Sequence, residues 1–439
     1  MVKQYFFAVA ILATLVFFTL TAVRIIRFFR MTKPAFPVRD LAKRFIVMLT
    51  IAFGQTRILR KPFTGLMHAL VFWGFCVILM GSAEMIIDGL FGTERSLHFL
   101  GGFYDFMIAS GDISALIIGV AIILFLGRRI LLHVKRFEGI EMKAISHIDA
   151  NIALLMILFL MLTLQGLNIT YCEIKVLNQE AIVGFYPVSR LFMGLFSSVP
   201  ESVLKVWYEI FWWSHILTIF IFAGYLPYSK HFHVFMSVPN VFLSRLYQPG
   251  KLTNMEHVTR EVRLMMDPNF DFGMPASDIP AERFGIKDAE DISWKNYLDS
   301  LACTECGRCT AVCPANITGK RLSPRKIMMD TRARMKEKGP GLVKNGKSFD
   351  DHRSLIRDYI TEEELWACTT CNACARECPI CINQPELIVD MRRYLVMEEG
   401  AVPGLLKVTF NNIENNGAPW AYSPEDRLLW AKDLEIRMN

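Results

Sequence analysis

The sequence predicts an all-α membrane protein, in which a bundle of five transmembrane helices precedes a mainly helical, cysteine-rich domain. Hydrophobic residues make up 53% of the chain, which contains 33 phenylalanines. The long apolar stretches lie in the first half, whereas charged and proline-punctuated sequence fills the second. Two cysteine quadruplets of the same spacing lie in that second half. This distribution excludes a protein that is soluble along its whole length.

Five segments are long and apolar enough to cross a membrane, since a transmembrane helix needs about 20 mostly apolar residues. They cover approximately residues 5–23, 65–83, 107–127, 152–171 and 206–228. The first lacks a small-residue cleavage site and is followed at once by Arg24, Arg27 and Arg30. We therefore expect a retained span rather than a signal peptide. A further apolar stretch at 182–199 is broken by a proline and an arginine, which predicts an interfacial or partly buried loop.

The loops between these spans predict the orientation of the chain. Lys and Arg are concentrated after the first and third spans, and Glu and Asp after the second and fourth. Because cytoplasmic loops carry the excess of Lys and Arg, the N-terminus is predicted outside and the cysteine-rich half in the cytoplasm. The expected location is the inner (cytoplasmic) cell membrane. The net charge of +6 follows from the same loops and favours membrane orientation over nucleic-acid binding.

The cysteine quadruplets predict iron–sulfur chemistry. Each is a C-x2-C-x2-C-x3-C-P run, formed by Cys303, Cys306, Cys309 and Cys313 and again by Cys368, Cys371, Cys374 and Cys378. In this ferredoxin pattern the fourth cysteine of one run ligates the cluster built by the other. Two [4Fe-4S] clusters are predicted, one on Cys303, Cys306, Cys309 and Cys378, the other on Cys368, Cys371, Cys374 and Cys313. Structural zinc uses pairs of ligands, and disulfides are disfavoured in a reducing cytosol, so both alternatives fit less well.

Three other cysteines, Cys76, Cys172 and Cys381, are expected to be buried thiols that act as small hydrophobes.

Four histidines in or beside the spans predict haem binding, because polar groups within a membrane are costly and commonly functional. His68 lies early in the second span, His215 in the outer half of the fifth, and His231 and His233 near the inner end of the fifth. We predict that His68 and His233 ligate a b-type haem near the inner face. Helical phase places His215 and His233 on one face and His231 opposite, unless Pro227 bends the helix. His215 is the candidate for a second, outer haem; the alternative for His231 and His233 is a location among lipid headgroups.

Asp112, in the third span, is the intramembrane carboxylate best suited to proton transfer at a quinone site between these helices. The alternative, which we favour, is that it caps the start of that span.

The chain is expected to contain a membrane domain (1–240), a connector (241–295), a two-cluster ferredoxin domain (296–400) and a C-terminal tail that docks a partner (401–439). Ser323 should cap a helix that ends at Gly339-Pro340-Gly341. Thr361 and Glu364 should form a capping box, and residues 388–396 an amphipathic helix.

The chain resembles two known families over nearly its whole length. Residues 1–240 resemble the five-helix cytochrome b of the respiratory nitrate reductase gamma family and of the membrane subunit of heterodisulfide reductase. Residues from 295 on are similar to the heterodisulfide reductase ferredoxin module in Cys303-x2-Cys306-Gly-Arg-Cys309, Thr318-Gly-Lys-Arg-Leu-Ser-Pro-Arg-Lys, Leu365-Trp-Ala-Cys-Thr-Thr-Cys371 and Met391-Arg-Arg. Fused electron-transfer-flavoprotein:menaquinone oxidoreductases of that superfamily have the same order of parts. The nitrate reductase family has two histidines on its second span, whereas here Ile78 occupies the place of the second.

The resemblance implies a membrane-bound subunit that passes electrons between (mena)quinone at haem b and a cytosolic redox partner through two [4Fe-4S] clusters. The stretches at 416–420 and 427–434 resemble the linker that leads into two cysteine-rich CCG domains. We expect those domains on a separate polypeptide, with a flavoprotein or other cytosolic carrier as a further partner, and the active site for the cytosolic substrate on a partner chain. The alternatives are a haem-free membrane anchor for a cytosolic iron–sulfur complex and an iron–sulfur redox sensor.

Overall fold

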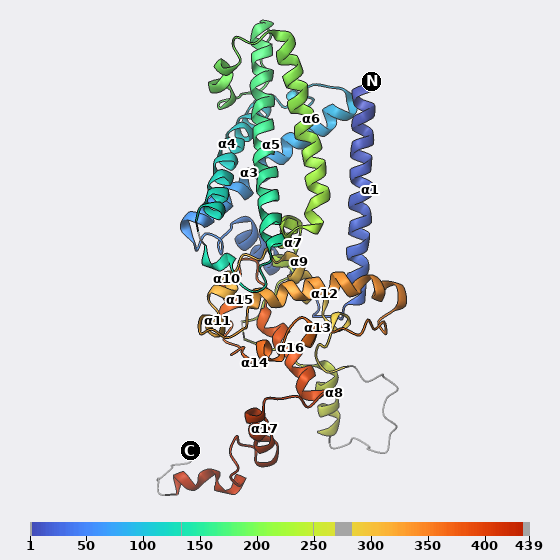
Figure 1. The fold of residues 1–439 in the computed structure, drawn as a ribbon, viewed down its shortest axis with the longest axis vertical. Coiled ribbons are helices and arrows are strands. Elements are labelled where there is room, and N and C mark those ends of the chain that lie inside the picture. Colours follow the sequence, from blue (N-terminus) through green and yellow to red (C-terminus); the bar gives the residue numbers. More distant parts are fainter. Residues whose placement is uncertain (1, 133, 249, 268–282, 433–439) are drawn as a thin grey trace. The chain divides into compact units, whose positions relative to one another are not determined.

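The computed structural model describes the chain outside residues 1, 133, 249, 268–282 and 433–439, and the elements it describes are helical (Figure 1). Two isolated β-bridges, Lys33 with Ser293 and Ile356 with Ile360, are recorded among these residues. The chain divides into two compact units, one of Met1–Lys251 and Asp288–Pro385, the other of Leu252–Lys287 and Glu386–Asn439. The first unit thus contains both the apolar helices and the cysteine quadruplets, and the predicted all-α class is confirmed.

Five long apolar helices form the membrane bundle, as predicted. They are α1 (Val2–Met31), α3 (Pro62–Phe91), α4 (Gly102–Ile130), α5 (Ala144–Leu177) and α6 (Glu201–Tyr225), and they lie side by side in Figure 1. At 1.5 Å per residue, each exceeds the ~30 Å hydrocarbon core of a bilayer. Between 11% and 39% of the most apolar stretch of each helix is buried in the protein. The remaining apolar surface therefore suits contact with lipid.

Close packing between aromatic rings and glycines holds the bundle together. Helix α1 packs on α3 and α6, and α3, α4, α5 and α6 pack in sequence. Phe7 of α1 is fully buried, and its ring centroid lies 5.6 Å from that of Trp212. A Cβ added at Gly89 would lie 2.7 Å from the Phe7 ring, so this glycine lets α1 approach α3.

Shorter elements connect the long helices. In the first unit these are α2 (Leu41–Met48), the π-helix η1 (Leu49–Phe53), α7 (His233–Phe242) and the 3₁₀ turns η2 (His98–Leu100), η3 (Lys135–Phe137), η4 (Ser189–Leu195), η5 (Leu226–Tyr228), η6 (Lys230–Phe232) and η7 (Ala289–Asp291). Pro62 begins α3 at a position where its missing N–H costs nothing, and Gly92 ends that helix in the left-handed conformation.

The cysteine-rich part of the first unit is built from short helices around one long one. They are α9 (Trp294–Ala302), α10 (Arg308–Ala311), α11 (Pro314–Ile317), α12 (Pro324–Asn345), α13 (Leu355–Asp358), α14 (Glu362–Trp366) and α15 (Ala373–Glu377). Ser323 caps α12, and Thr361 and Glu364 form a capping box on α14, so both predicted caps are confirmed. Helix α12 packs against α1 and α9 (Figure 1).

The predicted end of α12 is wrong. The helix continues through Pro340 to Asn345 rather than stopping at Gly339. The Phe28 ring of α1 would lie 2.9 Å from a Cβ at Gly339, and the Phe349 ring 2.1 Å from one at Gly341. The glycines that suggested a helix break are therefore sites of close packing, and tertiary contacts override their low helix propensity.

Glu141 and Arg325 form a buried ion pair between the α4–α5 loop and the first turn of α12. Their charged groups lie 2.7 Å apart, and the side chains are 3% and 1% exposed. We expect Glu141→Ala to lower the free energy of unfolding by about 3–5 kcal/mol, because it leaves a buried guanidinium unpaired. Urea titration in detergent, with proteolysis of the cysteine-rich part as the readout, measures this change.

The matched control is Glu363→Ala, which removes an ion pair with Arg321 whose side chains are 63% and 70% exposed. This substitution should lower the free energy of unfolding by about 1 kcal/mol or less. Equal effects of the two substitutions would contradict the role given to the buried pair.

A second buried arginine makes stability depend on pH. Arg334 is fully buried and donates to both carboxylate oxygens of Asp288 and of Asp351. Hydrogen bonds from Arg334 lower the pKa of Asp351 to about 2. Burial alone would raise the pKa of Asp288, but hydrogen bonds from Arg334 and Lys338 outweigh it and lower that pKa.

Both carboxylates therefore stabilise the fold above the pKa of an unfolded Asp, about 3.9, and lose that contribution as pH falls toward their folded values. The melting temperature in detergent should drop between pH 4 and pH 2.5. For Asp351, whose interaction is partly screened by solvent, this corresponds to a loss of about 1 kcal/mol in the free energy of unfolding. Asp351→Asn should melt lower at pH 6 and show a flatter pH profile. Parallel profiles of melting temperature against pH for the wild type and Asp351→Asn would contradict this role of the Asp351 carboxylate.

The second unit contains α8 (Glu256–Met265), most of α16 (Gln384–Met397), α17 (Gly404–Asn416) and the 3₁₀ helix η8 (Pro424–Ala431). The predicted amphipathic helix at 388–396 is confirmed within α16. Arg393 joins two parts of this unit by donating to Asp390 and to the carbonyl of Thr253. Residues 268–282 of the predicted connector lie outside the described residues, and the predicted boundaries at 240, 295 and 400 stay predictions.

Candidate redox centre

The two cysteine loops have the same backbone conformation. In each, the residues before and after the second cysteine are left-handed: Glu305 (φ 58°) and Gly307 (φ 72°) in the first loop, Thr370 (φ 52°) and Asn372 (φ 60°) in the second. Such residues reverse the chain over a short distance, and Gly and Asn adopt this conformation at least cost. Each loop then enters a short helix that contains the third cysteine. The repeated turn gathers three thiols of each run.

Burial and mutual proximity of the thiols fit cluster binding. Burial raises the pKa of the Cys374 thiol to about 12, and its thiol neighbours are Cys368, Cys313 and Cys371. Burial likewise raises the pKa of Cys309, whose strongest interactions with other thiols are, in order, those with Cys306, Cys303, Cys378 and Cys374. Each group combines three cysteines of one run with the fourth of the other. Iron binding would displace the protons and neutralise the crowded thiolates.

Two backbone amides point at these sulfurs. The N–H of Thr370 lies 3.4 Å from Cys368 Sγ, and the N–H of Ile382 lies 3.4 Å from Cys378 Sγ. Such hydrogen bonds tune the potential of an iron–sulfur cluster. Within the described residues, no three His, Cys, Asp or Glu side chains converge tightly enough to hold a single ion. A cubane attaches its four ligands to four separate irons, so its cysteines can lie farther apart than the ligands of a single ion.

The other three cysteines differ from one another. Cys172 is buried, as predicted, and Cys381 is partly buried. Cys76 is exposed, so its predicted burial inside the protein is wrong. Its position on α3 suits a thiol that faces lipid, which composition alone does not distinguish from a buried one.

His68 and His233 each have one ring nitrogen engaged by an oxygen. His68 Nδ1 lies 3.1 Å from Gln55 Oε1, and His233 Nδ1 lies 3.3 Å from the carbonyl oxygen of Lys230. A proton on Nδ1 leaves Nε2 with a lone pair for a metal, which is the usual arrangement of a ligating histidine. The two rings lie within electrostatic range of each other. Their donor chemistry therefore fits a haem iron.

The helical phase predicted for the histidines is wrong. Helix α6 ends at Tyr225, two 3₁₀ turns follow, and α7 begins at His233, so His215 and His233 lie on different helices. Pro227 lies in the first of these turns, where it cannot donate a helical hydrogen bond. The rings of His231 and His233 are only 5.9 Å apart rather than on opposite faces.

His231 and His215 also have partners at Nδ1. His231 Nδ1 lies 3.1 Å from Ser229 Oγ. Burial, and to a lesser extent the nearby His233 ring, lowers the pKa of His231 to about 3, so this imidazole is neutral at pH 7. His215 is buried in the bundle, 3.0 Å from Thr163 Oγ1 and 3.1 Å from the carbonyl oxygen of Leu160. Haem ligation by any of the four histidines stays a prediction.

Asp112 does not cap α4, which starts at Gly102. Its buried carboxylate accepts hydrogen bonds from the backbone N–H groups of Val188 and Ser189, at 2.8 and 2.9 Å, and from Asn168 at 3.3 Å. It therefore anchors the 3₁₀ turn η4 between α5 and α6. The span was expected to begin at about residue 107, whereas α4 begins at Gly102, so Asp112 lies within the helix.

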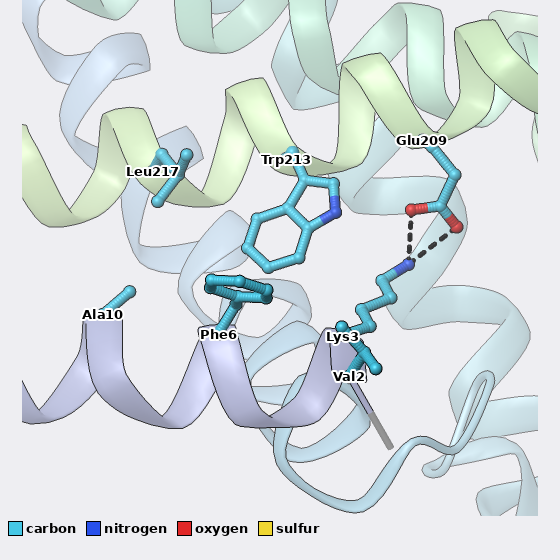
Figure 2. Close-up of a pocket in the computed structure, with 7 residues that line it drawn as sticks. All are labelled: Val2, Lys3, Phe6, Ala10, Glu209, Trp213 and Leu217. Atoms are coloured by element: carbon cyan, nitrogen blue, oxygen red, sulfur yellow. Dashed lines mark hydrogen bonds and ion pairs between the residues drawn. The ribbon is translucent and has the colours of Figure 1, made fainter.

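A groove of about 620 Å³ lies where the start of α1 meets α6. Figure 2 shows its lining of Val2, Lys3, Phe6, Ala10, Glu209, Trp213 and Leu217. Lys3 forms a 2.7 Å ion pair with Glu209 beside it and lies 4.2 Å from the centre of the Trp212 ring. No histidine or cysteine of the predicted sites lines this groove.

Sequence comparisons agree with the cysteine geometry. The 4Fe-4S dicluster domain matches residues 302–382. The chain carries two [4Fe-4S] clusters. It is also similar to the probable iron-sulfur-binding oxidoreductase FadF of Bacillus subtilis, with 30% identity over 88% of this chain and 55% of that protein. The EtfAB:quinone oxidoreductase of Syntrophomonas wolfei subsp. wolfei is 28% identical over 90% of this chain and 55% of its own length.

A shorter match covers 24% of this chain and 52% of one subunit of the ferredoxin/F(420)H(2)-dependent CoB-CoM heterodisulfide reductase of Methanosarcina acetivorans, with 35% identity. The chain spans about half the length of the three relatives. No solved structure matches it. It is thus an iron–sulfur protein with five candidate membrane helices, related to iron–sulfur oxidoreductases; the ligand assignment of the eight quadruplet cysteines stays a prediction.

Proposed function

We propose that the chain is a membrane-bound electron-transfer subunit that passes electrons between (mena)quinone in the membrane and a soluble redox partner. The observation that supports this most directly is that one compact unit contains both the apolar bundle and the cysteine quadruplets. Within it, Arg308 of the first cysteine loop lies within electrostatic range of His68 on α3. When bound, the clusters supply one-electron redox chemistry.

A b-type haem would be held by His68 and His233, in a bundle of the nitrate reductase gamma type. Gln55 and the Lys230 carbonyl would orient the two rings, and Nε2 of each would face the iron. His215, on α6, is the candidate ligand of a second haem, and His231 is the alternative to His233. A haem supplies one-electron transfer within the membrane, between a quinone that carries two electrons and clusters that carry one.

The orientation that we propose has the N-terminus outside and the cysteine-rich part in the cytoplasm, because the loops rich in Lys and Arg lie on that side of the bundle. The similarity to a protein named EtfAB:quinone oxidoreductase supports a quinone as one substrate and a soluble flavoprotein as a partner. The similarity to one subunit of a heterodisulfide reductase supports a further subunit of such a complex as another partner, and we propose that it is the polypeptide with CCG domains. Exposed Leu405, Trp420 and Trp430 in the tail offer apolar surface for such a polypeptide.

The deciding experiment measures haem and electron flow on one preparation. The purified protein is placed in phosphatidylcholine vesicles that contain long-chain menaquinone, its clusters are reduced with dithionite, and their reoxidation is followed by electron paramagnetic resonance (EPR). Pyridine haemochrome gives haem b per chain. One or two haems with menaquinone-dependent reoxidation support the proposal. No haem and no reoxidation would identify a haem-free anchor instead.

A further inference from the structure

We propose that the two clusters work in a fixed order. The cluster on Cys303, Cys306, Cys309 and Cys378, here called the inner cluster, exchanges electrons with the membrane bundle. The cluster on Cys368, Cys371, Cys374 and Cys313, the outer cluster, exchanges them with the soluble partner. This order rests on the proposed function and on the predicted ligand sets, but the contacts that define it belong to the chain itself.

The first cysteine loop is held against the segment that leads into α3. Arg308, between Cys306 and Cys309, is 9% exposed and donates to the carbonyl oxygens of Arg57 and Ile58, at 3.2 and 3.4 Å. Arg57 in turn donates to the carbonyl oxygen of Cys378, at 3.0 Å. The segment that precedes the helix of His68 therefore touches the ligand set of the inner cluster on both sides.

The same loop is also held against the segment that carries His233. Glu305, between Cys303 and Cys306, accepts hydrogen bonds from Ser146 of α5 at 2.5 Å and from Lys230 at 3.3 Å, and pairs with Arg332. The side chains of Glu305 and Lys230 are both only 8% exposed. The carbonyl of Lys230 is the group that engages His233 Nδ1. Both histidine segments thus contact the first cysteine loop, one through Arg308 and the other through Glu305.

The second cysteine loop lies toward solvent. Cys371 and Thr369, two residues before it, are exposed, and Cys368 is partly exposed. Ile317, which ends the short helix after Cys313, is 67% exposed. Figure 1 shows α14, just before this loop, on the side of the cysteine-rich part away from the bundle, and α10 of the first loop on the side toward it.

One contact joins the membrane loop to α15 of the second run: Arg60 donates to the carbonyl oxygen of Arg376, at 3.0 Å. Arg376 lies two residues from both Cys374 and Cys378, so this contact lies close to a ligand of each predicted set. Helix α10, which contains Cys309, packs against α15, which contains Cys374, so the two ligand sets are neighbours. In this order of transfer, one electron from each reduced cluster and two protons from solvent convert one quinone into one quinol.

The first test measures exposure on the unmodified protein and does not depend on activity. EPR power saturation of the dithionite-reduced protein in detergent is recorded with and without a dysprosium–EDTA chelate, which relaxes paramagnets near the protein surface. The signal absent from Cys371→Ser is assigned to the outer cluster, and the signal absent from Cys306→Ser to the inner one. The half-saturation power of the outer signal should rise several-fold and that of the inner signal much less. Equal effects, or a larger effect on the inner signal, would overturn the order.

The second test uses the menaquinone vesicles. In Cys306→Ser the remaining outer cluster should be reoxidised several-fold more slowly than the remaining inner cluster of Cys371→Ser. The reverse pattern would overturn the order while leaving the proposed function intact. If menaquinone reoxidises neither cluster of the wild type, the proposed function fails, and the dysprosium result alone decides which cluster faces solvent.

Discussion

Replacing Cys306 with serine is expected to lower the iron content from about eight to about four atoms per chain. The Cys306 thiol belongs to the group around Cys309, and no other thiol of its own loop can take its place: Cys303 and Cys309 already belong to the same group. Loss of this ligand removes the inner cluster, while the thiols around Cys374 stay together. Iron and acid-labile sulfide assays, with EPR of the reduced protein, measure the change.

Cys381 provides the matched control. It lies near Cys378, is partly buried, and burial raises the pKa of its thiol, so it shares the surroundings of a ligand without belonging to either predicted set. Cys381→Ser should keep about eight irons per chain. A loss of iron in this variant with retention in Cys306→Ser would mean that Cys381 is a ligand and that the spacing rule assigns the wrong cysteine.

The parts of this protein that could be predicted from sequence are those fixed by local chemistry. Cysteine spacing within a run brings three thiols together through a short turn, whatever the rest of the chain does. The five spans follow from apolar length, and the caps at Ser323 and Thr361 from side chains that bond to their own helix. Each of these features depends only on residues that are close in sequence, so the sequence pattern was sufficient to predict it.

The failures occurred where a distant segment determines the local structure. Gly339 suggested a helix end but contacts Phe28 of α1, and Asp112 suggested a cap but anchors a loop after α5. Gln55, which engages His68, gave no sequence signal, because its role depends on a partner thirteen residues away, across a turn and the start of α3. Glu305 and Arg308 were also missed. A charge inside a cysteine loop, where most residues are small or neutral, is the signal that could have indicated their contacts with the bundle.

His68→Ala and His233→Ala should each abolish haem b binding, whereas His231→Ala should retain it. The distinction rests on proximity alone, since His68 interacts electrostatically with His233, whereas the Nδ1 atoms of all three rings are engaged by an oxygen. A single axial imidazole rarely holds a b haem with the spectrum of a bis-histidine site, so loss of either ligand should have the same effect. Pyridine haemochrome per chain and the optical spectrum of the reduced protein measure it.

His231 is the sharpest control because its ring centroid lies 5.9 Å from that of His233 and both side chains are partly buried. Its Nδ1 faces the Ser229 hydroxyl, and the same hydroxyl accepts the backbone N–H of His231, which together hold the ring in the turn. If His231→Ala lost haem and His233→Ala kept it, the ligand would be His231 and the inner cluster would connect to the bundle through the Ser229 turn. Iron in the clusters should be unchanged in all three variants, because the cysteine loops contact the backbone of Arg57 and the side chain of Lys230 rather than the imidazoles. A parallel loss of cluster iron would instead show that the histidines hold the first unit together, and haem loss alone could then no longer assign an axial ligand.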